Sequence, residues 1–347
     1  MKNLYLLIAT FLFFQTANAQ ATWDTIMIGV SKISGTRYPS CYGISKTGAN
    51  ELFGATSTGL YKSTDNGNNW VAKSVNGSMF YSPKAVYNAN SGRLLAVGGY
   101  KYAVIKSDDN GNTWDTTMAF GNSSSGEALI KTTNGNLYAA IWDNNNNSFN
   151  GVFVSTDNGN TWTMKSPFTG YNKIWTLLNV TDSIFVAGTN KGFYYSADAG
   201  STWTPAGLNS STNLILKIIK HPNGTLYAST AGKGIQKSTN NGQSWTASTM
   251  DSTSSATYYD IDADQAGNIY VSSFNVGVIK FDANETLVET FAGTTNGLFQ
   301  SKIREFLIDE SGSAPVYYIA CEAAVSGADL NGYFFRRGLA TGINENN

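Results

Sequence analysis

The sequence predicts an all-β fold, a seven-bladed β-propeller with four-stranded blades whose ring is closed by the N-terminal strand. Three observations support this prediction. An eight-residue motif ending in tryptophan recurs five times, short β-type runs precede each copy, and an unmatched strand lies near the N-terminus. The motif tryptophans are 44, 48, 41 and 42 residues apart: Trp70, Trp114, Trp162, Trp203 and Trp245. This period is typical of a four-stranded propeller blade.

Each motif copy follows the pattern S-x-D-x-G-x-T-W or a close variant. The Asp side chain closes a tight turn on its own backbone, and the Gly supplies the positive φ that the turn needs. The Trp begins the next strand and buries a large ring between neighbouring sheets. We therefore interpret these residues as structural: Asp65, Gly67, Trp70, Asp109, Gly111, Trp114, Asp157, Gly159, Trp162, Asp198, Gly200, Trp203, Gly242 and Trp245.

The first 19 residues have the features of a secretory signal peptide. Lys2 precedes the apolar run 4–14, and Ala17-Asn18-Ala19 provides a cleavage site before Gln20. We expect the propeller to cover 20–341, followed by a short tail at 342–347. No later apolar run approaches the ~20 residues of a membrane helix. The mature protein is therefore expected to be a monomer that is secreted, periplasmic or held at the cell surface.

Within the propeller, each motif is preceded by three β-type runs. In one unit these are 174–178, 183–187 and 192–195, and the fourth strand begins at Trp203. A sixth unit, around 268–287, keeps the strands but has a decayed motif. The seventh has three strands, at 305–308, 316–320 and 332–335, and no fourth. The run 22–28 is expected to supply this fourth strand, because its Trp23 lies 47 residues before Trp70, within the range of the repeat. Closing the ring in this way removes the open sheet edges.

Composition narrows the chemistry that is available. The chain is 14% charged, has a net charge of −1 and contains no basic block. We therefore do not expect it to bind nucleic acid. His221 is the only histidine, so neither a Ser-His-Asp triad nor a multi-histidine metal site is expected. We expect no metal and no cofactor.

The two cysteines occupy positions that the blade register brings together. Cys41 starts the first strand of the first blade, and Cys321 ends the second strand of the last blade. These blades are neighbours in a closed ring, and both ends lie on the same face. In an exported protein the pair either forms a disulfide that staples the ring or remains as two buried thiols. The sequence leaves both arrangements open.

The repeated motif resembles the Asp-box, or BNR repeat, of secreted β-propellers. The resemblance implies non-enzymatic relatives, the sortilin-type receptors and photosystem assembly factors, and enzymatic ones, the sialidases and xyloglucanases. Arg37-Tyr38-Pro39 is similar to the R-I-P segment of sialidases, but no arginine lies between 94 and 303, where that family's middle arginine would be. Xyloglucanases pair two seven-bladed units around a cleft, whereas one unit fills this chain.

The ligand surface is expected on the face opposite the motifs, around the central channel, where the repeat is irregular. The longest insertion, 142–150, joins a tryptophan to four consecutive asparagines. We predict an exported, non-enzymatic binding or scaffold propeller that recognises a protein or a glycan. The ligand-binding residues are predicted to be Trp142, Asp143, Tyr100, Tyr171 and Trp175.

Two other functions stay open at the level of the sequence. One is a glycoside hydrolase, sialidase-like or xyloglucanase-like, which needs a pair of suitably spaced carboxyl groups. Its candidate residues at the channel mouth are Arg37, Glu127, Arg304 and Glu305. The other is a purely structural module of a surface assembly.

Overall fold

A computed structural model of the chain describes most of the propeller. It describes residues 23–26, 40–75, 77–79, 82–99, 102–119, 124–143, 149–168, 173–208, 213–250, 257–273, 276–291, 302–322 and 333–338. The predicted signal peptide, its cleavage site and the tail at 342–347 lie outside these ranges.

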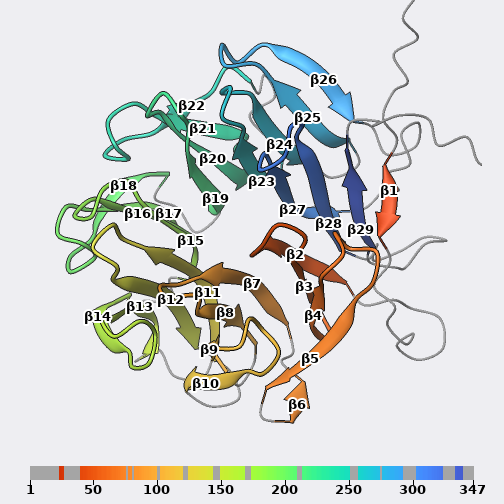
Figure 1. Cartoon of the computed structure of the whole chain (residues 1–347). Coiled ribbons are helices and arrows are strands. Elements are labelled where there is room, and N and C mark those ends of the chain that lie inside the picture. The colour runs from red at the N-terminus through yellow and green to blue at the C-terminus, as the bar shows by residue number, and fades with distance from the viewer. Residues whose placement is uncertain are drawn as a thin grey trace, which may run out of the picture.

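The strands form seven antiparallel sheets arranged as blades around a central axis, which confirms the predicted fold class (Figure 1). The first four blades are β2 (Cys41–Lys46), β3 (Leu52–Thr56), β4 (Gly59–Ser63) and β5 (Val71–Val75); β7 (Pro83–Asn88), β8 (Leu94–Gly98), β9 (Val104–Ser107) and β10 (Asp115–Met118); β11 (Ser124–Lys131), β12 (Leu137–Asp143), β13 (Gly151–Ser155) and β14 (Thr163–Pro167); β15 (Ile174–Asn179), β16 (Phe185–Thr189), β17 (Gly192–Ser196) and β18 (Thr204–Gly207).

The other three blades are β19 (Leu214–Lys220), β20 (Leu226–Ala231), β21 (Ile235–Ser238) and β22 (Thr246–Ala247); β23 (Tyr258–Ala263), β24 (Ile269–Ser273), β25 (Gly277–Phe281) and β26 (Leu287–Phe291); β27 (Lys302–Asp309), β28 (Val316–Glu322), β29 (Tyr333–Arg337) and β1 (Asp24–Ile26). The first blade carries an additional short outer strand, β6 (Ser78–Met79), paired with β5.

The N-terminal strand closes the ring as predicted. β1 pairs antiparallel with β29, with Thr25 opposite Phe335, and so becomes the outer strand of the last blade (Figure 1). Trp23, which precedes it, packs edge-to-face on Phe291 of the sixth blade with ring centroids 6.2 Å apart. The innermost strands contact their neighbours all the way round, including β27 with β2.

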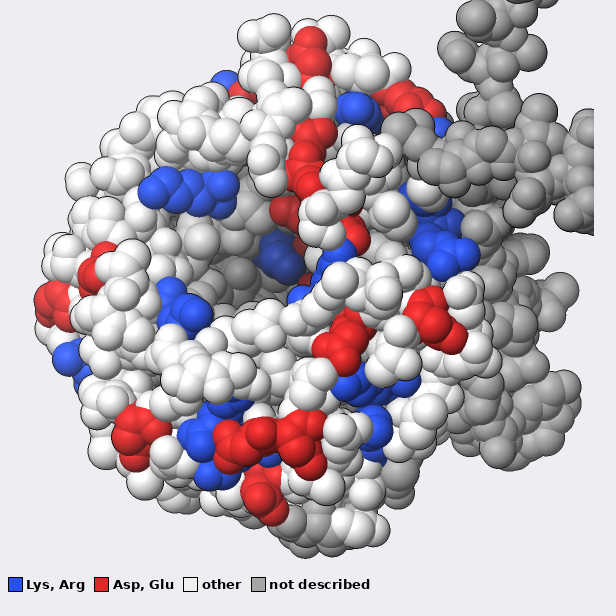
Figure 2. Space-filling view, in the orientation of Figure 1, with Lys and Arg blue, Asp and Glu red and all other residues white. Residues whose placement is uncertain are grey.

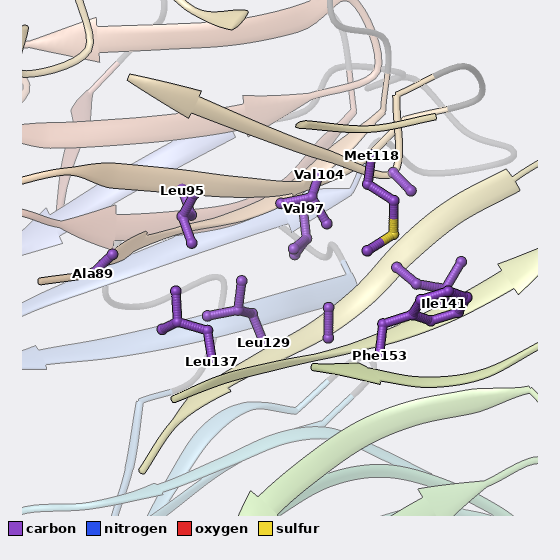
Figure 3. Packing of buried hydrophobic residues seen from close by; sticks show 11 residues of the cluster. Ala89, Leu95, Val97, Val104, Met118, Leu129, Leu137, Ile141 and Phe153 are labelled. Atoms are coloured by element: carbon purple, nitrogen blue, oxygen red, sulfur yellow. The ribbon is translucent and has the colours of Figure 1, made fainter. Parts of the chain in front are cut away.

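The core of the described chain consists of seven apolar clusters, each lying between two neighbouring blades. Figure 3 shows the cluster between the second and third blades, where Leu95 and Val97 of β8 face Leu129 of β11 and Leu137 of β12. The second strand of a blade contributes to the clusters on both of its faces. All five residues of β3, of β8 and of β16 are accordingly buried.

The motif turns share one hydrogen-bonding pattern. In the third blade Ser155 Oγ donates to Asp157 Oδ1 (2.8 Å), the Gly159 N–H donates to Ser155 Oγ (2.8 Å), and the Thr161 N–H donates to Asp157 Oδ1 (2.9 Å). Equivalent bonds form in the other four copies, with Asn240 in place of Asp in the fifth. Because the Thr161 hydroxyl and N–H favour the ionised form, they lower the pKa of Asp157 to about 2. Each side chain is thus occupied within its own turn.

The motif glycine is required for two reasons. Gly111 has a φ of +77°, which side chains rarely adopt, and a Cβ there would lie 2.3 Å from the ring of Phe53 in the preceding blade. The motif tryptophan also contacts the preceding blade: Trp114 packs edge-to-face on Phe53 at 5.9 Å, and Trp245 stacks on Phe193 at 4.0 Å. The motif therefore closes a turn and joins two blades.

The sixth blade replaces the decayed motif with a different link between blades. Asp282 still closes a tight turn by accepting the Thr286 N–H (2.8 Å). Glu285, where φ is +65°, reaches the fifth blade and accepts hydrogen bonds from Lys237 Nζ (2.8 Å) and the Tyr227 hydroxyl (3.0 Å). An ion pair here takes over the contact that the motif makes elsewhere.

Cys41 and Cys321 lie on the neighbouring strands β2 and β28, as the register predicts, and both are buried thiols without a disulfide between them. The structure therefore has the second of the two arrangements left open by the sequence. Burial, and then the proximity of Cys321, raises the pKa of Cys41. His221 is also buried, and its Nε2 lies 2.9 Å from the Gly267 carbonyl oxygen of the next blade.

Deleting residues 20–30 removes β1 and leaves β29 as an open edge. We expect a lower melting temperature and self-association, because an unpaired edge strand is a template for pairing with another chain. Thermal unfolding and size-exclusion chromatography measure both effects. Deleting 342–347, which removes no described strand, is the control. A monomeric product of the 20–30 deletion with unchanged melting temperature would contradict closure by β1.

Trp114→Ala removes a buried ring from the contact between the first two blades. We expect a loss of roughly 3–5 kcal/mol in the free energy of unfolding, the range for truncating a buried aromatic side chain. Trp114→Phe keeps an aromatic ring against Phe53 and should lose clearly less. Urea denaturation measures the difference, and equal stability of Trp114→Ala and the wild type would show that this ring contributes no packing energy.

Candidate functional site

The first strand of every blade contains a β-bulge at the same position. The pairing register with the second strand shifts by one residue at each of these sites. A bulge of this kind bends the strand and changes the direction of a side chain. The seven residues at the shift are Tyr42, Lys84, Glu127, Trp175, Leu216, Tyr259 and Arg304.

All seven of these residues line one hollow at the centre of the ring, with a volume of about 450 Å³. The bulges lie near the beginning of the first strands, so the hollow is on the face opposite the motif turns. Figure 2 looks onto one face of the ring, where charged side chains of both signs surround the central hollow. Sevenfold backbone repetition thus presents six residue types around one axis, since only tyrosine occurs twice. We call these seven residues the bulge ring.

Two carboxylates beside the bulge ring, those of the buried Asp260 and the half-buried Glu305, connect the innermost strands of neighbouring blades. Asp260 Oδ2 accepts the Phe306 N–H of the next blade (2.7 Å), and Glu305 Oε2 accepts the Ile44 N–H of the first blade (3.0 Å). Gly43 leaves room for the second bond, because a Cβ there would lie 2.6 Å from Glu305 Oε2 and 2.0 Å from the Lys84 carbonyl oxygen. These carboxylates take the place of strand pairing where blades meet.

Lys217 Nζ lies between these carboxylates, 3.6 Å from Asp260 Oδ1 and 3.6 Å from Glu305 Oε1. Burial raises the pKa of Glu305 to about 7 against the opposing charge of Lys217. Burial, and then the charge of Asp260, raises the pKa of Asp262 to about 6. The charge of Asp260 raises the pKa of Lys217, so this lysine remains a cation.

On the other side of the hollow, Lys173 is enclosed by two indoles and a carboxylate. Its Nζ lies 4.0 Å from the ring centroid of Trp175, 4.7 Å from that of Trp142, and 2.7 Å from Glu127 Oε1. Burial lowers the pKa of Lys173, and the charge of Glu127 opposes this effect. Glu127 also accepts a hydrogen bond from the Ser125 hydroxyl.

Arg304 and Lys84 complete the charged groups of the bulge ring. Arg304 Nε donates to Glu322 Oε2 (2.6 Å), and its guanidinium lies 5.1 Å from the ring centroid of Tyr259. Lys84 Nζ lies 5.6 Å from the ring centroid of Tyr42 and 3.9 Å from Glu127 Oε2.

The structure gathers part of the residue set predicted from the sequence. Trp175, Glu127, Arg304 and Glu305 all line the hollow, and Trp142 lies beside Trp175 over Lys173. Arg37, Tyr100 and Tyr171 lie outside the described residues. The hollow also contains Lys84, Lys217, Tyr42 and Tyr259, which sequence reasoning did not select. Lys84, Tyr42 and Tyr259 share one position in the blade register, and Lys217 directly follows that position in its own blade; this repeated position was the available signal.

The prediction that Trp142 and Asp143 belong to an inserted loop is wrong. Both are the last residues of β12, where they pair with Ser125 and Ser124 of β11. Asp143 is buried, and its N–H donates to the Asn150 side chain, so it belongs to the blade rather than to the lining of the hollow. The continuous apolar run of β12 extends to Trp142, and Asp143 is the last residue of the strand.

Two further features of the described chain bear on its chemistry. No three or more His, Cys, Asp or Glu side chains in the described ranges gather where they could hold a metal ion. Across the same ranges, no helix is both long and apolar enough to cross a membrane.

No protein-family model matches the chain, and no curated protein matches it. Many solved structures share its fold. The extracellular domain of a putative hybrid two-component system from B. thetaiotaomicron is 13% identical, with a TM-score of 0.66 over 91% of this chain and 42% of that one. The GH74 xyloglucanase from Xanthomonas campestris is 14% identical, with a TM-score of 0.64 over 90% and 56%.

YCF48 bound to D1 peptide is similar over nearly its whole length. It is 14% identical, with a TM-score of 0.65 over 93% of this chain and 97% of that one. By contrast, the chain spans about half the length of the two-component system's extracellular domain and of the xyloglucanase. At these identities the likeness shows the seven-bladed fold, which enzymes and binding proteins both use.

The raised pKa values of Glu305 and Asp262 predict a pH-dependent stability. Each group holds a proton more tightly in the folded state, so its contribution is fully present below the ordinary carboxyl pKa and is lost as the pH rises through about 6 to 7. We expect the free energy of unfolding to fall between about pH 5 and about pH 8. Glu305→Gln, which stays neutral, should reduce this slope.

Urea denaturation at several pH values measures that slope. Glu289→Gln is the control, because Glu289 lies on the outer strand β26 and its Oε1 is 3.4 Å from Arg337. It should keep the wild-type slope. A wild-type stability that rises across the same pH range would contradict a protonated Glu305.

Proposed function

We propose that the protein is an exported, non-enzymatic binding propeller that recognises a segment of another protein at the central hollow. The observation that carries this proposal is the bulge ring, in which a repeated backbone feature presents seven side chains of six residue types to one cavity. Ligand sites are concave and combine aromatic walls with a few polar groups. The hollow has Tyr42, Trp175 and Tyr259 together with the charged groups of Lys84 and Arg304.

The bonding of the carboxylates favours binding over hydrolysis. Glu305 and Asp260 each accept a backbone N–H of the next blade, and Glu127 is held by Lys173 and Ser125. A glycosidase needs one carboxyl group as acid and another as base or nucleophile, both able to reach the sugar. Here these groups are engaged in joining blades, a structural role that requires no substrate.

The solved structures supply a precedent for a protein ligand. YCF48, which has the same architecture over nearly its whole length, has been seen bound to D1 peptide. The extracellular domain from the two-component system places such a propeller outside the cytoplasm. The location of that domain agrees with the predicted signal peptide, which makes a partner outside the cytoplasm the expected ligand.

Glycoside hydrolysis is the second candidate, and one observation favours it. The pKa of Glu305, raised to about 7, suits a general acid, and Asp260 lies on the other side of Lys217. Release of reducing sugar from xyloglucan, or of sialic acid from sialyllactose, measures this activity. Release by the wild type that is lost in Glu305→Gln would support the hydrolase and contradict the binding proposal.

The binding proposal predicts that peptides selected by the mature chain from a random display library bind at the hollow. Trp175→Ala should weaken such a peptide by at least ~2 kcal/mol, the threshold for a binding hot spot, or about 30-fold in Kd. Leu287→Ala, on the exposed outer strand β26, is the matched control and should bind normally. Isothermal titration measures both. Equal affinities of the folded variants would place the binding surface elsewhere.

A further inference from the structure

The hollow presents cations above carboxylates that are less exposed. The side chains of Lys84, Lys217 and Arg304 are 35%, 38% and 33% exposed. The carboxylates beneath them, Glu127, Asp260 and Glu305, are 3%, 3% and 20% exposed. Although the lining contains both signs of charge, a ligand entering the hollow therefore meets ammonium and guanidinium groups first.

Two of these cations, and the less exposed Lys173, also occupy aromatic faces of the hollow. Lys84 lies over Tyr42, Arg304 lies over Tyr259, and Lys173 lies over Trp175. A neutral sugar would need a bare ring on which to stack, and here a cation stands in that place. An anionic ligand needs no displacement, because a cation over an aromatic ring keeps hydrogen-bond donors for a carboxylate.

We propose that the hollow binds an acidic protein segment, whose carboxylates are held by Lys84, Lys217 and Arg304. This inference rests on the proposed function and specifies its ligand chemistry. The bonds from Arg304 to Glu322 involve Nε and Nη2 of a group with five N–H donors. Lys217 stands 3.6 Å from each of two carboxylates, and its ammonium has three N–H donors, so it can serve a ligand carboxylate as well.

The size of the hollow limits how much of a partner enters it. A volume of about 450 Å³ lies within the range of small-ligand sites and accommodates a few residues rather than a folded surface. The segment is therefore an extended acidic stretch or a chain terminus. Both offer the same carboxylate chemistry and are separable by experiment.

The test uses fluorescein-labelled peptides and fluorescence polarisation with the mature chain. The probes are amidated hexaglutamate, amidated hexalysine, and hexaserine with either a free or an amidated C-terminus. We expect hexaglutamate to bind and its affinity to fall at least tenfold between ~50 mM and ~500 mM salt, because added salt screens exposed charges. Binding of hexaserine only as the free acid would identify a chain terminus as the source of the carboxylate, and would also support the proposal.

Lys84→Gln and Arg304→Gln should each weaken the acidic peptide at least fivefold. Lys165→Gln removes the same charge from the exposed outer strand β14 and should leave the affinity unchanged. If Arg304→Gln fails to fold, Lys84→Gln together with Lys84→Arg, which keeps the charge and should restore binding, decides the question.

The other outcomes separate failure of this inference from failure of the proposed function. Stronger binding of hexalysine or amidated hexaserine, lost in Trp175→Ala, would overturn the acidic ligand and leave a peptide site at the hollow. Tetragalacturonate, an acidic oligosaccharide, tests whether the carboxylates belong to a glycan. If it binds at the hollow more tightly than hexaglutamate, the choice of a protein segment is overturned. Binding of none of these probes would overturn the inference, and sugar release lost in Glu305→Gln would overturn the proposed function as well.

Discussion

Each blade has to bury both of its faces against neighbouring blades, and the rest of the structure depends on this constraint. The second strands have apolar side chains on both faces, as the complete burial of β3, β8 and β16 shows. Such a sheet leaves one face in water unless a neighbour covers it on each side. Seven similar blades satisfy this need only when the last packs on the first, and the cluster of Ile26, Cys41 and Phe334 lies at that junction. Ring closure is therefore a packing requirement.

Closure brings seven first strands side by side around an axis, and polar side chains join them there. The Val86 N–H donates to Ser45 Oγ (3.0 Å) and the Ile218 N–H to Thr176 Oγ1 (3.3 Å), as other backbone amides do to Asp260 and Glu305. These bonds satisfy backbone groups that have no strand partner across the gap between blades. Several charged residues that resemble catalytic groups in the sequence thus hold the inner wall together.

The two faces of the ring divide structure from recognition. On one face, nearly identical turns repeat from blade to blade, and each Asp side chain is occupied by its own turn. On the other, a repeated backbone bulge presents residues of different chemistry, from Glu127 to Trp175 and Leu216. A shared backbone feature with varied side chains lets the hollow gain specificity without altering the blades. The irregular face is accordingly where the proposed ligand is bound.

The sequence by itself determined the period, the number of blades, the closing strand and the tryptophan contacts between blades. These features are local and repeated, so each copy of a motif such as Ser155–Trp162 reports the same environment. Only the tertiary structure decided that Trp142 lies at the end of a strand and that Lys173 lies between two indoles. It also decided that the Glu305 side chain accepts a hydrogen bond from the Ile44 N–H. Such contacts join residues up to 261 positions apart. No local pattern encodes them, because they arise only when the closed ring brings the first strands together.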